Sequence, residues 1–204
     1  MGLLSSSVSI TRYKVVGKLE EPVIEAVTQG LKKNILREID EDETEKASGW
    51  TSFNNPFKPD FTGSSFLIGT HFVFSLRIDK KSIPSKIIQK YYILETSKKL
   101  AENNREFLSR NEKKLIREHV INTLSLRIPA TPKIYDLVWN YEKNYLWFFS
   151  NLKTANEELE TFFSKTFKLT LIRLFPYTMA ELSCSLSDAD RDLLLKISPA
   201  EFTR

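Results

Sequence analysis

The sequence has little cysteine and little histidine: one cysteine, Cys184, and two histidines, His71 and His119, occur in 204 residues. One cysteine excludes an intramolecular disulfide, and no histidine pair has the spacing of zinc ligands. We therefore predict no structural metal site, and the composition suits a reducing cytoplasm. A lone histidine or cysteine without a catalytic motif around it is usually structural. We assign no catalytic residue among the three and expect Cys184 to be buried.

Glycine is also scarce, and none of the six glycines forms a phosphate-binding loop of the G-x-G-x-x-G or G-x-x-x-x-G-K type. The run Asp40, Glu41, Asp42, Glu43 offers the carboxylates that a divalent metal would need. Metal ligands usually converge from separate rigid elements, so a solvated loop is the preferred interpretation. A metal-dependent nuclease that uses this run or His71 is the alternative. The sequence predicts a protein that is not an enzyme, with no cofactor and no small-molecule substrate.

Long apolar runs are missing: none approaches the roughly 18 residues of a membrane helix. The segment Met1 to Ser7 lacks the basic start of a signal peptide. We expect a cytoplasmic protein without a membrane partner. Hydrophobic residues make up 41% of the chain and aromatic residues 12%, which is enough for a substantial core.

The periodicity of apolar residues predicts an α+β fold with a mostly antiparallel sheet, helices packed on one of its faces and a projecting basic helical hairpin. Strands are expected at 8–16, 66–78, 134–141, 145–149 and 169–175. Helices are expected to begin near Pro22, Pro84, Ser109, Thr154 and Ser187. Residues 1–78 and 129–176 would form two parts of one core, 79–128 the hairpin, and 177–204 a C-terminal extension.

Local signals mark several boundaries. Ser109 with Glu112, and Thr154 with Glu157, have the spacing of capping boxes. Residues 40–48 are polar and aperiodic, which predicts a mobile loop. Residues 49–63 combine four aromatic side chains with prolines, which predicts an ordered loop. The apolar stripe of the first hairpin helix is expected to contain Ile87, Ile88, Tyr91 and Leu94, and that of the second Leu115, Ile116, Val120 and Leu124.

The helical hairpin is rich in lysine and arginine, although carboxylates partly offset them. A salt-bridged, solvated helix pair is one interpretation. Contact with DNA phosphates is the other, because cations at helical spacing can follow a duplex backbone. No recognition helix that reads bases is evident, so binding would not depend on sequence. The predicted DNA-binding residues are Lys81, Lys86, Lys90, Lys113, Lys114, Arg117 and Arg127.

An ordered set of short motifs over residues 1–176 supports this second interpretation. They are Gly49-Trp50 followed by Pro56; Lys81-Ser82-Ile83-Pro84; Glu112-Lys113 with Arg117 and Val120; Leu124-Ser125-Leu126-Arg127; the Trp139–Phe149 hairpin; and the Glu157–Lys165 helix. This set resembles the recombination-associated protein RdgC family of bacteria. Leu126 stands where that family has proline, and the turn before Tyr145 lacks the family's Asn-Gly.

The resemblance implies a nucleoid-associated accessory protein of DNA recombination or replication. RdgC proteins bind double-stranded DNA without base specificity as ring-shaped dimers, and they restrain the RecA recombinase. Members of the family are typically longer at the C-terminus, so an open clamp is an alternative to a closed ring. A module that keeps the fold and binds a protein in place of DNA is another alternative.

The predicted β-hairpin at 134–149 carries apolar side chains on both faces. Trp139 and Tyr141 alternate with Val138 on one strand, and Tyr145 and Trp147 face one way on the other. A large exposed apolar patch is unusual on a monomer. The second face therefore needs a cover, either the segment Pro176–Arg204 or a second copy of the chain in a homodimer.

Overall fold

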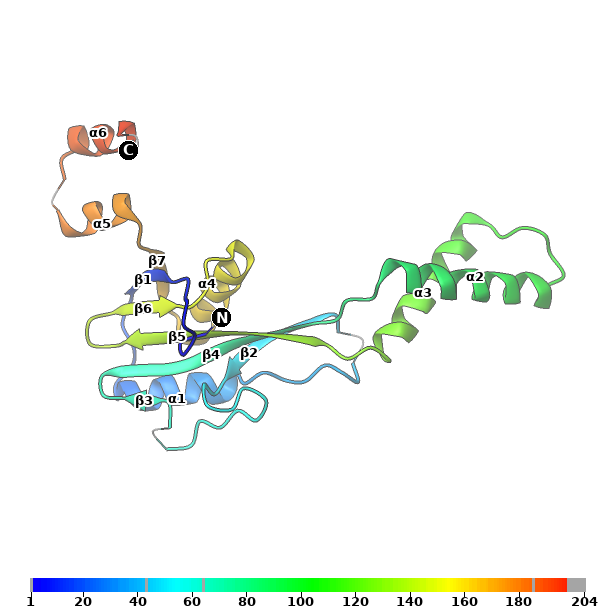
Figure 1. The fold of residues 1–204 in the computed structure, drawn as a ribbon, viewed down its shortest axis with the longest axis horizontal. Coiled ribbons are helices and arrows are strands. Elements are labelled where there is room, and N and C mark those ends of the chain that lie inside the picture. The colour runs from blue at the N-terminus through cyan, green and yellow to red at the C-terminus, as the bar shows by residue number, and fades with distance from the viewer. Residues whose placement is uncertain (1, 43, 64, 185, 198–204) are drawn as a thin grey trace. The chain divides into compact units, whose positions relative to one another are not determined.

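The computed structural model describes residues 2–42, 44–63, 65–184 and 186–197. Its strands are β1 (Thr11–Val16), β2 (Lys46–Thr51), β3 (Leu67–Ile68), β4 (His71–Lys80), β5 (Thr131–Asn140), β6 (Tyr145–Phe148) and β7 (Thr170–Arg173). Its helices are α1 (Val23–Lys33), α2 (Ser85–Glu102), α3 (Arg110–Ser125), α4 (Lys153–Phe167), α5 (Pro176–Ser183) and α6 (Asp188–Lys196). The strand order is β2-β4-β5-β6-β1-β7, with β3 paired to β4 (Figure 1). The predicted α+β class is confirmed.

The chain divides into two compact units. One combines the chain up to Leu31 with Phe61–Phe74 and the part from Tyr135 onward. The other combines Lys32–Asp60 with Ser75–Ile134. Strands β4 and β5 each contribute residues to both units. The division places residues 32–60 with the helical hairpin, whereas the sequence suggested that the hairpin stands apart from both halves of the core.

The core of the first unit lies between its sheet and helix α4. β1 pairs antiparallel with both β6 and β7, and β6 pairs with β5. The Trp139 ring on β5 contacts the α4 rings of Phe163 and Phe167, at centroid distances of 5.1 and 5.4 Å. Phe167 also lies where a side chain at Gly30 of α1 would be, so α1 packs closely against α4. This aromatic packing fixes α4 on one face of the sheet.

A buried polar network also joins this sheet to α4. The Tyr13 hydroxyl lies 2.6 Å from Asn156 Oδ1 and 2.9 Å from Glu160 Oε1. Arg173 on β7 donates to the same Glu160 oxygen at 2.6 Å. Asn156 in turn donates to the backbone carbonyls of Ser150 and Leu152. Burial, and then the bond to Glu160, raise the pKa of Tyr13 above its ordinary value. The side chains of Tyr13, Asn156, Glu160 and Arg173 thus satisfy one another, which fixes the position of α4 along the sheet.

In the second unit β2 pairs antiparallel with β4, from Lys46 opposite Lys80 to Thr51 opposite Ser75. The segment around Ile35 pairs in parallel with β2, and a Cβ atom at Gly49 would overlap the Leu36 N and Cα atoms. The flanking bonds are Leu36 N–H to the Trp50 carbonyl at 3.2 Å and Trp50 N–H to the Asn34 carbonyl at 2.9 Å. Only glycine allows this close approach.

The aromatic loop after β2 is held by a buried ion pair. Arg77 donates two hydrogen bonds to Asp79, at 2.8 and 2.6 Å, and its guanidinium lies over the Phe57 ring. Ser75 and Arg77 are therefore buried, so the second face of β4 is covered here rather than wet. The contact between Arg77 and Phe57 anchors the loop at 49–63, which was predicted to be ordered. The region 40–48 was predicted to be a mobile loop, but its last residues belong to β2.

Helices α2 and α3 cross each other in the second unit (Figure 1). The predicted capping box at the start of α3 is confirmed, because Ser109 Oγ accepts from Glu112 N–H and Glu112 accepts from Ser109 N–H. These bonds hold the pKa of Glu112 below its ordinary value. The apolar contact is formed by the α3 cluster of Leu108, Ile116, Val120 and Leu124 and by the α2-side residues Ile83, Ile88, Tyr91, Tyr92 and Leu100.

Several sequence predictions are wrong in detail. Ile87, Leu94 and Leu115 are exposed, because α2 turns Tyr92 rather than Leu94 towards α3. The capping box at Thr154 is absent, since α4 begins one residue before it with Leu152 as N-cap. The expected long strand at 66–78 is divided by a turn at Gly69, where φ is +59°. Helix α5 lies in the C-terminal extension, where the sequence analysis assigned no element before the helix near Ser187.

Two glycine substitutions should distinguish the stability cost of a steric overlap with neighbouring backbone, at Gly49, from the cost of a positive φ, at Gly69. We expect Gly49→Ala to reduce the free energy of unfolding by about 3 kcal/mol, because the methyl group overlaps backbone that cannot move away freely. Gly69→Ala meets no atom within 4 Å and should cost only about 1–2 kcal/mol, from its positive φ. Urea denaturation of both variants measures the difference. Equal losses would contradict the proposed role of Gly49.

Candidate nucleic-acid interface

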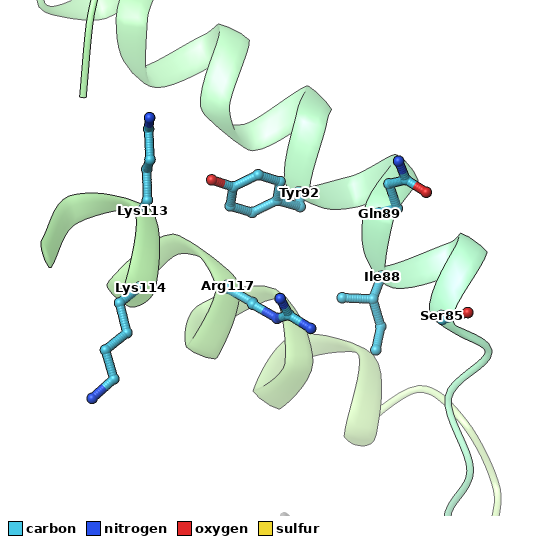
Figure 2. Close-up of a pocket in the computed structure, with 7 residues that line it drawn as sticks. All are labelled: Ser85, Ile88, Gln89, Tyr92, Lys113, Lys114 and Arg117. Carbon is cyan, nitrogen blue, oxygen red and sulfur yellow. The ribbon is translucent and has the colours of Figure 1, made fainter. Parts of the chain in front are cut away.

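A groove runs between α2 and α3 and has a volume of about 640 Å³ (Figure 2). Its lining residues come from both helices: Ser85, Ile88, Gln89 and Tyr92 from α2, and Lys113, Lys114 and Arg117 from α3. The figure shows the Tyr92 ring reaching from α2 towards α3 and the Arg117 side chain reaching towards Ile88. Lys114 points away from α2, at the edge of the groove.

Helical spacing explains why these side chains meet. Lys113 and Arg117 are four residues apart on α3, and Ser85, Gln89 and Tyr92 are four and three residues apart on α2, so each set lies on one side of its helix. The capping box fixes where α3 begins, and the cations lie in its first turns. The positive end of the helix dipole adds to their charge there.

The lining of this groove contains three cations and no carboxylate. Lys114 Nζ lies 3.7 Å from Glu118, and both side chains are exposed, so this pair contributes little. Neither Lys113 nor Arg117 has an ion-pair partner among the residues that the structure describes. Lys113 and Arg117 therefore present positive charge without a carboxylate partner among the described residues, beside hydroxyl and amide groups, whereas Glu118 partly offsets the charge of Lys114.

The opposite side of the helix pair has a different character. A smaller pocket of about 100 Å³ lies there, and Glu95 and His119 line it together with Arg127. The carboxylate of Glu95 offsets the guanidinium charge in this lining. Positive charge without a carboxylate is therefore a property of the first groove and not of the helix pair as a whole.

The seven predicted DNA-binding residues occupy four different places. Lys113, Lys114 and Arg117 come together in the groove. Lys86 and Lys90 are exposed on α2 but do not line it, and Arg127 lines the opposite pocket. Lys81 is a correction: its side chain is buried.

Lys81 is 5% exposed, and its ammonium group donates to three backbone carbonyls. These are the carbonyls of Asp40 at 3.0 Å, Asp42 at 2.6 Å and Ser125 at 2.7 Å. Ser125 is the last residue of α3, where a cation stabilises the free carbonyl end of a helix. The ammonium thus connects the 40–42 loop to the hairpin and cannot reach a DNA phosphate.

Sequence reasoning missed the contribution of α2 to the groove. Gln89 and Tyr92 are polar or amphipathic and carry no charge, so a search for lysine and arginine could not select them. Their spacing relative to Ser85 is the signal that was available. This spacing places the three residues on one side of α2. That this side faces the α3 cations is known only from the contact between the two helices.

The acidic run and Cys184 are two further candidates from the sequence. The Asp40 side chain accepts the Ala130 N–H at 2.8 Å, and Glu43 of the same acidic run lies outside the described residues. Within the described ranges, no three histidine, cysteine or acidic side chains are grouped as a metal site. Cys184 is exposed at the end of α5, contrary to the prediction, because α5 contains no buried residue.

Two further findings complete the description of the chain. Among the described residues, no helix combines the length and apolar character needed to cross a bilayer. The sequence matches no protein-family model and no curated protein.

Lys81 provides a direct test of its reassignment. We expect Lys81→Met to lower the free energy of unfolding by about 2–4 kcal/mol, because three carbonyls lose their donor. Lys86→Met removes the same charge from an exposed position and should change stability by less than about 0.5 kcal/mol. Chemical denaturation of both variants provides the comparison. If Lys81→Met were as stable as Lys86→Met, the buried anchoring role of Lys81 would be wrong, and Lys81 would again count among the predicted DNA-binding residues.

Proposed function

We propose that this protein binds double-stranded DNA through the α2–α3 groove, without reading its sequence. The observation that supports this most directly is the lining, which has three cations, no carboxylate and a volume of about 640 Å³. Lysine and arginine on adjacent helical turns suit the repeated phosphates of a duplex, and release of counterions from those phosphates favours binding.

The chemistry of the lining favours phosphate contacts over base contacts. The Lys113 ammonium and the Arg117 guanidinium would form ion pairs with phosphate oxygens and donate hydrogen bonds to them. Arg117 can donate two hydrogen bonds at once. The hydroxyl of Tyr92 and the amide of Gln89 add uncharged donors to the same groove. Side chains of this kind position a duplex but carry no sequence information.

The motif order supports a more specific role. Together with the groove, the resemblance to RdgC favours an accessory protein of DNA recombination or replication that limits access of a recombinase such as RecA to DNA. In this role the protein would be a bacterial cytoplasmic, nucleoid-associated homodimer that clamps or encircles the duplex.

The salt dependence of DNA binding tests the groove. The double variant Lys113→Ala/Arg117→Ala should bind a duplex more weakly, and its slope of log affinity against log salt should be shallower by about 2, because each lost phosphate contact contributes about 0.9. Fluorescence anisotropy with a labelled duplex across a salt series measures both quantities. Two duplexes of unrelated sequence should give the same affinity.

A control variant with the same charge change is available on α4. Lys153→Ala/Lys165→Ala removes two exposed lysines from the first unit and should leave the slope close to that of the unmodified chain. Equal effects of the two double variants would mean that net charge, rather than the groove, determines binding. Absence of duplex binding at low salt would refute the proposal.

The proposed dimer can be tested separately. Large apolar side chains are exposed on the helix pair, namely Ile87, Ile93, Leu94 and Leu115. Apolar side chains that stay exposed on this helix pair are the candidates for the dimer contact. We expect sedimentation velocity at micromolar concentration to show a dimer that Leu94→Glu converts to monomer. A monomer at all concentrations, with and without DNA, would refute the dimeric clamp.

A further inference from the structure

The sheet of the first unit has a second candidate site, on the face opposite the Tyr13–Asn156 network. Tyr13 and Lys14 are adjacent on β1, so their side chains point to opposite faces. The pocket has a volume of about 350 Å³, which is within the usual range for a bound small molecule. Its lining residues are Arg12, His71, Asn140, Lys143, Tyr145, Trp147, Leu174 and Met179.

Two aromatic side chains on β6 are the main apolar groups of this face. Tyr145 and Trp147 are two residues apart on one strand and are each 42% exposed, whereas Trp50 and Trp139 are fully buried. The His71 ring stacks against Trp147, with a centroid distance of 6.2 Å and an interplanar angle of 29°. Helix α5 reaches the pocket only through Met179, so the described C-terminal residues leave the Trp147 ring half open.

Positive charge surrounds these rings. Arg12 is paired with Trp147 and Lys14 with Tyr145 in the β1–β6 register. The Lys14 ammonium lies over the Tyr145 ring at 4.4 Å and donates to the Lys143 carbonyl, while the Arg12 guanidinium donates to the Met179 sulfur at 3.4 Å. The pocket lining contains no carboxylate. A ligand with an aromatic ring and negative charge matches this combination.

The edge of the pocket is held in place by hydrogen bonds. Asn140 Oδ1 accepts the Lys143 N–H at 2.8 Å, which directs the Asn140 amide nitrogen towards His71 Nε2 at 3.0 Å. This contact with Asn140 holds the His71 ring from its Nε2 edge. The imidazole that stacks on Trp147 is thus fixed in orientation before a ligand binds, which reduces the entropic cost of binding.

We propose that this face binds an unpaired nucleotide of single-stranded DNA, with its base stacked on Trp147 and its phosphates bound by Arg12 and Lys143. Base stacking on aromatic side chains of a sheet face, beside cations that follow the backbone, is a general mode of single-strand recognition. An apolar protein segment would use the rings but leave the cations without partners. This site does not depend on the α2–α3 groove, which is proposed to bind duplex phosphates.

Tryptophan fluorescence tests the proposal directly, because Trp147 is the one tryptophan of the three that is exposed. Addition of a 20-nucleotide oligothymidine should quench it, whereas an abasic strand with the same phosphates should not. Trp147→Leu keeps an apolar side chain without a ring and should reduce the affinity for a dye-labelled oligothymidine, measured by fluorescence anisotropy, by about tenfold. Trp147→Phe should restore most of that loss. Unchanged binding by Trp147→Leu, or equal quenching by the abasic strand, would overturn the assignment.

Further measurements separate this site from the groove. Lys113→Ala/Arg117→Ala should leave the oligothymidine quenching unchanged, and Trp147→Leu should leave duplex affinity unchanged. Loss of duplex binding in both variants would contradict two separate sites. Thymidine monophosphate should bind much more weakly than the strand, because it lacks the neighbouring phosphates. Equal affinity for the free nucleotide would overturn the single-strand assignment. Thermal denaturation of each variant shows that lost binding is not lost folding.

Discussion

The ammonium group of Lys81 is the contact on which the second unit depends. It lies at the junction of β4 and α2, and its three hydrogen bonds bring together the 40–42 loop and the last residue of α3. The Lys81 backbone N–H is also bonded to the Glu45 carbonyl at 2.9 Å. A buried charge is tolerated only when every proton has an acceptor, and here three carbonyls satisfy it. The chain just before α2 and the end of α3 are thereby held together at one point.

This anchor is needed because the helices have a limited core of their own. No residue of α2 is buried, and the apolar cluster of the pair contains four buried side chains, all on α3 or just before it. With α3 fixed by the Ser109 capping box at one end and by Lys81 at the other, the three groove cations occupy defined positions. The buried Lys81 thus helps to hold the helix that carries Lys113, Lys114 and Arg117 at its surface.

The local structure could be predicted well from the sequence. The proline before α2, the Ser109–Glu112 capping box and the alternation of β5 and β6 act over a few residues, so their signals lie in the sequence itself. Failures occurred where distant segments compete. Thr154 has the right spacing for a cap, but Leu152 occupies that position because α4 begins earlier. Alternation left open whether the Arg77 face of β4 is wet or covered, and only the contacts with Asp79 and Phe57 show that it is covered.

Periodicity and composition are local properties, so the fold class, the helical hairpin and the number of cations in the hairpin follow from the order of amino acids alone. Which of those cations are available depends on the packing of the folded chain. Lys81 and Lys86 are five residues apart with the same charge, yet one is buried among carbonyls and the other is exposed. Likewise, Trp139 and Trp147 are equivalent in the pattern of the hairpin, but α4 covers only the first. Which side a neighbouring element covers depends on contacts between residues far apart in the chain.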